Sequence, residues 1–192
     1  VSIFPTPHET KPPARFTEAS IVQRLEKEGV GRPSTYATII GTILDRGYAR
    51  KDANAILPTF TGMAVAQLLT THFPKLVEYS FTSGMENALD EIADGTLDSV
   101  KYLKSFYSGK KGLKELVDSQ EKSIKPDESR TINLPHLSDT VDIKVGRYGP
   151  YIISTGEGKD EVHASIPEDI APLDQRGLQY LLYLQDVSDM LF

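Results

Sequence analysis

The spacing of the hydrophobic residues changes once along the chain, and this change limits the folds that the sequence can adopt. Up to about residue 121, most apolar side chains recur every three to four residues, as they do on amphipathic helices. After residue 130 the pattern becomes an alternation of apolar and polar residues, clearest at 140–145, which is typical of strands. We therefore expect an α+β protein in which a mainly helical region precedes a small β-rich module.

The polar stretch that separates the two patterns, residues 122–130, contains Pro126 and is interpreted as a linker. It divides the chain of 192 residues into a helical domain at 1–121 and a β-rich module at 131–192, in line with one to two domains for this length. The first residue is not Met, so we expect a part of a longer protein.

Several classes of site are excluded or unsupported by the composition. The chain has no cysteine, which excludes disulfides and thiolate zinc sites. Its four histidines are widely separated, so we expect no metal site. No apolar run approaches the roughly 18 residues of a membrane helix, and residues 1–8 lack the pattern of a signal peptide. We therefore expect a cytoplasmic protein without a membrane partner.

The first sixty residues follow the outline of a CAP-like winged helix. A helix is predicted to begin after Thr17, with Ser20 nearby for capping, and to end at Gly29. A short turn leads to a second helix that begins at Pro33 or Ser34 and runs to about residue 47. Two short strands are predicted within 48–59, around a turn at 52–54. Helix, turn, helix and hairpin is the winged-helix order, which indicates DNA binding.

Further elements follow in both parts of the chain. A helix is predicted at 61–73, and another is predicted to begin near 81–83 with Ser83 and Glu86 as its capping box. One or two more helices are predicted over 97–120, with a break near 109–112. In the last third we predict strands at 140–145, 151–153 and 163–166, then a helix at 178–184.

The turn between the first two helices concentrates the groups that bind phosphate. Arg32 offers a planar fork that suits phosphate, and Ser34 and Thr35 add hydroxyls where a helix presents unpaired N–H groups. Arg46 and Arg50 could extend this track in one direction, and Lys11 and Arg15 in the other. The same residues also fit simple helix caps and surface ion pairs, since the helix dipole alone favours a cation at Arg46. These residues alone do not separate a DNA clamp from a transcription regulator.

The charge distribution favours the front of the chain as the DNA-binding part. The net charge is -6, but residues 1–60 hold eight Lys and Arg against six Asp and Glu. Residues 126–192 hold five against twelve. The acidity therefore lies in the last third, and a groove for phosphate is expected near the N-terminal end.

A resemblance decides between the two interpretations. The strings PPARFTEAS at 12–20, GRPSTYA at 31–37, DRGY at 45–48 and FTSGME at 81–86 closely resemble bacterial DNA topoisomerase I, a type IA topoisomerase. Pro58–Thr59 and Leu89–Asp90 also fit, so the match covers about residues 10–95. The strings VGRYGPY at 145–151 and ASIP at 164–167 resemble the C-terminal repeat module of zinc-free members, whereas residues 178–192 depart from the usual repeat ending.

The resemblance implies that this chain is the C-terminal part of the topoisomerase core, holding the second half of the domain that binds the gate strand, plus one repeat module. Such enzymes relax negatively supercoiled DNA without ATP, through a tyrosine that forms a 5′-phosphotyrosine, and they use Mg²⁺. The string Tyr-x-Arg-Thr-Asp-Ser around that tyrosine and the acidic Mg²⁺ motif do not occur here. We therefore expect no catalytic residue and no cofactor in this chain, with Mg²⁺ needed by the parent enzyme.

The partners implied are single-stranded DNA and the rest of the parent chain, and the location implied is the cytoplasm, in association with the nucleoid. The DNA-binding residues carried over or inferred beside them are Arg32, Ser34, Thr35, Arg46 and Arg15, with Arg147 and the stacking faces of Tyr148 and Tyr151 in the module. One alternative is a dimeric winged-helix regulator without catalytic activity, which would prefer duplex DNA. Another is a protein-interaction module whose acidic C-terminal region meets RNA polymerase or another partner.

Overall fold

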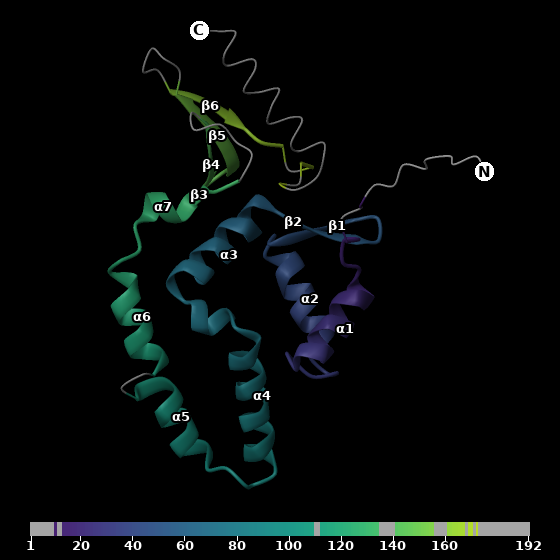
Figure 1. Cartoon of the computed structure of the whole chain (residues 1–192), viewed down its shortest axis with the longest axis vertical. Helices are drawn as coiled ribbons and strands as arrows, with labels where there is room; N and C mark the ends of the chain where they lie inside the picture. Colours follow the sequence, from purple (N-terminus) through teal and green to yellow (C-terminus); the bar gives the residue numbers. More distant parts are fainter. Residues whose placement is uncertain are drawn as a thin grey trace, which may run out of the picture.

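The computed structural model of the chain describes residues 10, 13–109, 112–134, 141–155, 161–167, 169, 170 and 172. They form seven α-helices, one 3-10 helix and six strands, so the α+β class is confirmed (Figure 1). Helix α3 lies between the two ends of the molecule, with the larger sheet at one end. At the other end, α4 and the α5–α6 pair form two limbs joined by residues 94–98 (Figure 1).

Helix α1 (Glu18–Glu28) begins and ends where its sequence signals predicted. Thr17 and Ser20 form a reciprocal capping box, in which the Thr17 N–H donates to Ser20 Oγ at 2.8 Å and the Ser20 N–H donates to Thr17 Oγ1 at 3.2 Å. Gly29 ends the helix with a left-handed φ of 68°. The first predicted helix is therefore confirmed, with a serine in the place where capping boxes usually have Glu or Gln.

Helix α2 (Tyr36–Asp45) begins later than predicted. Residues 33–35 form a turn, because the Thr35 and Tyr36 N–H groups both donate to the Arg32 carbonyl oxygen, at 2.8 and 3.2 Å. The predicted start at Pro33 or Ser34 is therefore wrong by two to three residues. Strands β1 (Ala49–Asp52) and β2 (Ala55–Pro58) form the predicted hairpin. The element order is thus the predicted one, while the assignment to winged helices stays a prediction.

The middle of the chain is helical, with one error in the predicted boundaries. Helix α3 (Phe60–His72) leads through the 3-10 helix η1 (Pro74–Val77) into α4 (Tyr79–Ala93). The predicted capping box at Ser83 and Glu86 is wrong, because Ser83 lies inside α4 and its hydroxyl donates to the Ser80 carbonyl. Helices α5 (Ser99–Ser108) and α6 (Leu113–Glu121) are separated at the predicted break.

The stretch predicted as a linker contains helix α7 (Pro126–Arg130). Pro126 occupies the first turn, where its fixed φ suits a helix, and acidic residues in that turn complement the helix dipole. Lys144 Nζ in the neighbouring sheet lies 3.0 Å from the Asp127 carboxylate of this helix. Residues 126–130 are therefore a packed element and not an extended connection, whereas the domain boundaries themselves stay a prediction.

The larger sheet is antiparallel in the order β3-β4-β5-β6, formed by β3 (Thr131–Ile132), β4 (Val141–Gly146), β5 (Gly149–Thr155) and β6 (Glu161–Ser165). The three predicted strands correspond to β4, β5 and β6. Strand β3 has only two residues, too few to show an alternation. The helix predicted at 178–184, and the whole of 178–192, lie outside the described residues.

One apolar core joins the helical region to this sheet. Phe60 and Ala64 of α3 pack against the buried aliphatic residues of the module, which are Ile132, Val141, Ile143, Ile152 and Ile166. Phe60 is 2% exposed and Ile143 is fully buried. Burial of each such side chain stabilises the fold by roughly 1.5–3 kcal/mol. The module is therefore held against α3 by the same contacts that stabilise the module itself.

A side-chain amide adds a polar connection at the same junction. Gln67 Nε2 of α3 donates to the Thr131 carbonyl at 2.9 Å, and the Asn133 N–H donates to Gln67 Oε1 at 3.1 Å. The amide thus pairs with the main chain of β3 as a neighbouring strand would. Among the described helices none is both long and apolar enough to cross a membrane.

Candidate nucleic-acid interface

The turn between α1 and α2 is held tightly by glycines. Gly31 is buried and has a positive φ of 79°. A Cβ built on it would lie 2.8 Å from Ile39 Cδ1 of α2, so the end of that side chain would have to move. The positive φ itself favours glycine at this position. The turn therefore holds Arg32 and its neighbours in a fixed position at the front of α2.

Arg32 is partly exposed, and its guanidinium donates hydrogen bonds to side chains of α4. Its Nε and Nη2 donate to Asp90 Oδ2 at 3.2 and 2.7 Å, and Nη2 also donates to Asn87 Oδ1 at 3.2 Å. Its Nη1 donates to the Gly31 carbonyl at 2.9 Å. The hydrogen bonds to Asp90 raise the pKa of Arg32 above its ordinary value, so its charge is permanent. A phosphate at this guanidinium would have to compete with the Asp90 carboxylate.

The two hydroxyl residues of the turn differ in availability. Thr35 Oγ1 accepts from the Arg32 N–H at 2.9 Å and donates to the Arg32 carbonyl at 3.0 Å, so it stabilises the turn. Thr35 makes no side-chain capping hydrogen bond to α2. Ser34 is exposed at the tip of the turn. At the start of α2, the Thr35 and Tyr36 N–H groups already donate to the Arg32 carbonyl.

Arg46 follows α2 at the end opposite the Arg32 turn, and the ten-residue helix between them is about 15 Å long at 1.5 Å per residue. It is exposed and, with Arg50 of β1, lines a hollow of about 390 Å³. Gly149 and Pro150 of β5 line the same hollow. Arg50 Nη2 donates to the Asp169 carbonyl at 2.7 Å, which ties the hairpin to the segment that follows β6. The structure therefore brings Arg46 toward the module and not toward Arg32.

Of the predicted module residues, Arg147 and Tyr148 form the turn between β4 and β5, and Tyr151 lies in β5. Tyr148 is 96% exposed, and the Arg147 guanidinium carbon lies 5.8 Å from the centre of its ring. Tyr151 stacks on His163 of β6 with 5.9 Å between ring centres. These residues and Arg130 line a second hollow, of about 440 Å³. The exposed aromatic faces and nearby cations are the features on which single-stranded nucleic acids stack.

The predicted set is therefore spread over several places. Arg15 is exposed in the segment before α1, and Lys11 lies outside the described residues. The sequence prediction missed Asp90 and Asn87 as partners of Arg32, although their spacing of three residues puts them on one face of a helix. It also missed Arg130 and His163, whose proximity to Tyr151 depends on strand pairing.

Comparison with known proteins assigns these features to a family. The family model for DNA topoisomerase matches residues 2–104, more than half of the chain. This chain belongs to the bacterial DNA topoisomerase family. It is 47% identical over 182 residues to DNA topoisomerase 1 of Synechocystis, and the match covers 95% of this chain and 20% of that protein. It is 44% identical over 187 residues to DNA topoisomerase 1 of Streptomyces coelicolor, with 86% and 19% covered.

A solved topoisomerase structure supports the fold as well. Full-length topoisomerase I from Thermotoga maritima superimposes with a TM-score of 0.66 at 30% identity, covering 84% of this chain and 26% of that one. The sequence resemblance to bacterial topoisomerase I is thus confirmed. The chain spans about one fifth of the length of the curated topoisomerases that it matches.

Proposed function

We propose that this chain is the part of a type IA DNA topoisomerase that binds single-stranded DNA and positions it while the parent enzyme relaxes negatively supercoiled DNA. The observation that carries the proposal is the α1–α2 turn, where a fixed arginine, an exposed serine and a helix N-terminus lie side by side in a topoisomerase fold. Phosphate contacts of this kind set the position of a strand without reading its sequence. The regulator hypothesis has no comparable support from the relatives.

The Arg32–Asp90 pair supports a mechanism of strand capture by exchange. In the free protein Asp90 neutralises the partly exposed guanidinium. An incoming phosphodiester replaces the carboxylate and accepts the same two N–H groups from Arg32. Asp90 is 60% exposed at its side chain, so it can turn into water when it is released. Ser34 then donates its hydroxyl, and the N–H groups of α2 add the helix dipole.

The chemical steps belong to the remainder of the parent chain. We propose that its tyrosine cuts the strand, that its acidic residues bind Mg²⁺, and that it acts on the cytoplasmic nucleoid. This chain then holds the strand in the orientation that the cutting reaction needs. Correct positioning of two reacting groups accounts for a large share of an enzyme's rate enhancement.

The proposal predicts that Arg32→Ala weakens single-strand binding regardless of sequence. Fluorescence anisotropy with labelled oligonucleotides of mixed sequence should show a lower affinity and a slope of log affinity against log salt that is smaller by about 0.7, the change for one lost phosphate contact. The matched control is Arg24→Ala, because Arg24 pairs with Glu28 of α1 and lies over the Tyr79 ring, with no described contact to Arg32 or Asp90.

Two results would refute this assignment. One is unchanged binding by the Arg32→Ala variant. The other is a competition experiment in which duplex DNA displaces a labelled single strand more effectively than an unlabelled single strand does. The second result would instead support a duplex-binding regulator.

A further inference from the structure

Helices α4, α5 and α6 form the two limbs at one end of the molecule, away from the larger sheet (Figure 1). The structure describes every residue of these three helices, and none of these residues is buried. Helices of nine or ten residues, such as α6 and α5, are marginal in water and depend on the packing of an apolar face. Within the described chain, α5 and α6 therefore lack part of the packing that helices of this length need.

Helix α5 is amphipathic, and most of its apolar face is open to solvent. Val100, Leu103 and Tyr107 are 57%, 56% and 52% exposed. At about 100° per residue these three side chains lie within an arc of about 60° and form one stripe, called here the outer stripe. Phe106 belongs to the adjoining strip of the same face, and its ring centre lies 6.0 Å from that of Phe81 in α4. Helix α4 thus covers one edge of the apolar face and leaves the outer stripe uncovered.

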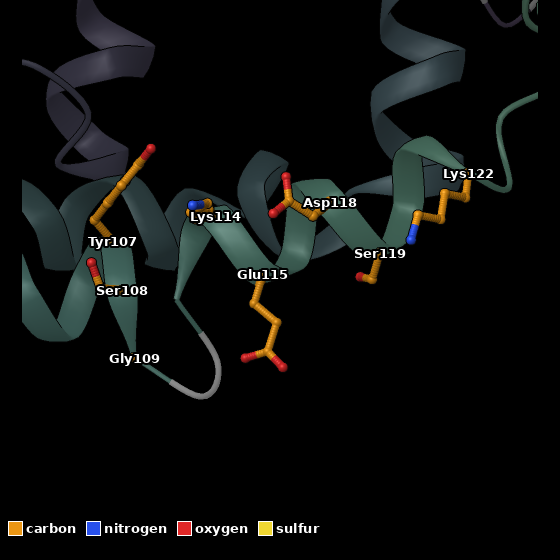
Figure 2. A pocket seen from close by; sticks show the side chains of 8 residues that line it. All are labelled: Tyr107, Ser108, Gly109, Lys114, Glu115, Asp118, Ser119 and Lys122. Carbon is orange, nitrogen blue, oxygen red and sulfur yellow. The ribbon is translucent and has the colours of Figure 1, made fainter.

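The outer stripe ends beside a hollow of about 540 Å³ at the junction of α5 and α6. Tyr107 belongs to the stripe and also lines this hollow, together with Asp118 and Glu115 of α6. In Figure 2, Tyr107 and Asp118 point to one side of the helices and Glu115 points to the other. A partner that covers the outer stripe would therefore find room for its side chains next to Tyr107.

The charges next to the outer stripe are positive. Residues 99–114 hold five lysines and no Asp or Glu, in a chain of net charge -6. Two of these lysines, Lys101 and Lys104, are exposed on the polar side of α5. Asp98 caps α5 by accepting the Lys101 N–H at 2.8 Å, and the carboxylates of the hollow lie on α6 beside other lysines. A surface that complements the stripe is therefore apolar at its centre and carries carboxylates at its rim.

Among the possible occupants of the stripe, the remaining parent chain fits best. A second copy of this chain would bring its own lysines against those of the first, and the repulsion disfavours that contact. A nucleic acid would gain little from Val100 and Leu103, because aliphatic side chains offer no ring on which a base can stack. This chain, in contrast, spans about one fifth of the length of its curated relatives. The covalent connection gives the remainder a high effective concentration at the stripe.

We propose that the outer stripe of α5 and the adjoining hollow form an internal docking surface, covered in the whole enzyme by an apolar, carboxylate-rimmed face of the remaining parent chain. This inference rests on the proposed function, because a longer topoisomerase chain supplies that face. Docking completes the packing of α5 and α6 and holds their limb in one position relative to α4.

Hydrogen–deuterium exchange of this chain alone and of the parent enzyme tests the docking surface. In the chain alone, the amides of α5 and α6 should exchange much faster than those of β4, whose Ile143 lies in the core. In the parent enzyme the same α5 and α6 amides should exchange at least about tenfold more slowly, because docking makes local opening less favourable. Equal exchange in the two proteins would overturn the proposal.

Two serine substitutions on opposite sides of α5 give a sharper test. Leu103→Ser removes the centre of the outer stripe, and Lys101→Ser on the polar side is the matched control, since Leu and Lys have similar helix propensities. In the parent enzyme, Leu103→Ser should raise the exchange of α5 about tenfold or more above the control, as the loss of a covered leucine implies. In the chain alone the two variants should behave alike. A similar effect of both variants in the parent enzyme would contradict docking at the stripe.

Two further results would overturn the proposal by identifying another occupant. One is oligothymidylate that slows the exchange of α5 in the chain alone, which would indicate a nucleic-acid surface. The other is exchange that slows as the concentration of the chain rises, which would indicate self-association.

The outcomes also separate this inference from the proposed function. If α5 is equally open in the parent enzyme while Arg32→Ala weakens strand binding, the proposed function stands and the docking surface is refuted. If α5 is protected in the parent enzyme while strand binding is independent of Arg32, the docking surface stands and the DNA-binding assignment is refuted.

Discussion

At the residue scale, the important feature is a carboxylate that occupies the expected phosphate site. Asp90 Oδ2 accepts two N–H groups from Arg32, as one phosphate oxygen could. Asn87 offers a neutral acceptor beside it. These hydrogen bonds hold Arg32 in one orientation before any ligand binds. The Asp90 carboxylate, however, competes with a phosphate for the same N–H groups. In the proposed function, the affinity of the turn for DNA would therefore depend on two residues of α4 as well as on the arginine.

This competition predicts that Asp90→Asn tightens single-strand binding by up to about fivefold, because an exposed ion pair contributes little. The substitution keeps the shape of the side chain and removes the charge that phosphate must displace. Asp94→Asn, on the same helix but without a described contact to Arg32, is the control. Anisotropy titrations at fixed salt measure the change, and weaker binding by Asp90→Asn would show that the carboxylate helps to hold the strand.

At the scale of elements, α3 organises the junction between helices and sheet. Its buried face supplies Phe60 and Ala64, and Gln67 pairs with the main chain around β3. We predict that Gln67→Ala destabilises the chain by about 1–2 kcal/mol, because two main-chain groups lose their partner. The melting temperature should fall by about 2–8 °C. Gln23→Ala, at an exposed position of α1, should leave it nearly unchanged, and an equal shift in both variants would contradict the role of Gln67.

Local sequence signals predicted some helix boundaries correctly. They failed where a boundary or a contact depends on residues far away in the sequence. Helix α1 carries its own start and end, in Thr17 and Gly29, and was predicted correctly. The start of α4 was missed because Glu78, which precedes it, makes no side-chain capping hydrogen bond, whereas Ser83 imitates a cap inside the helix. The sequence also placed Arg32 in a turn. Its contact with Asp90 spans 58 residues, and no local pattern predicts such a distance.

At the scale of the molecule, one core joins α3 to the larger sheet, so we expect the two to unfold together. We predict that Ile143→Ala, at a fully buried position of β4, lowers the free energy of unfolding by about 2–5 kcal/mol. Circular dichroism of the helices and tyrosine fluorescence should then shift together in a thermal melt, because Ile143 belongs to the same core as α3. Val100→Ala, at an exposed site of α5, is the control. Separate transitions would show that the two parts unfold independently.

One hydrogen bond links the segment before α1 to the β1–β2 hairpin, and so determines where a force on that segment would act. The Ile56 N–H of β2 donates to the Phe16 carbonyl at 2.7 Å, just before α1 begins. A pull applied to the main chain at residue 13 would therefore act on the hairpin as well as on α1. A movement of a larger assembly that pulls on this segment would thus be transmitted to β1, which carries Arg50.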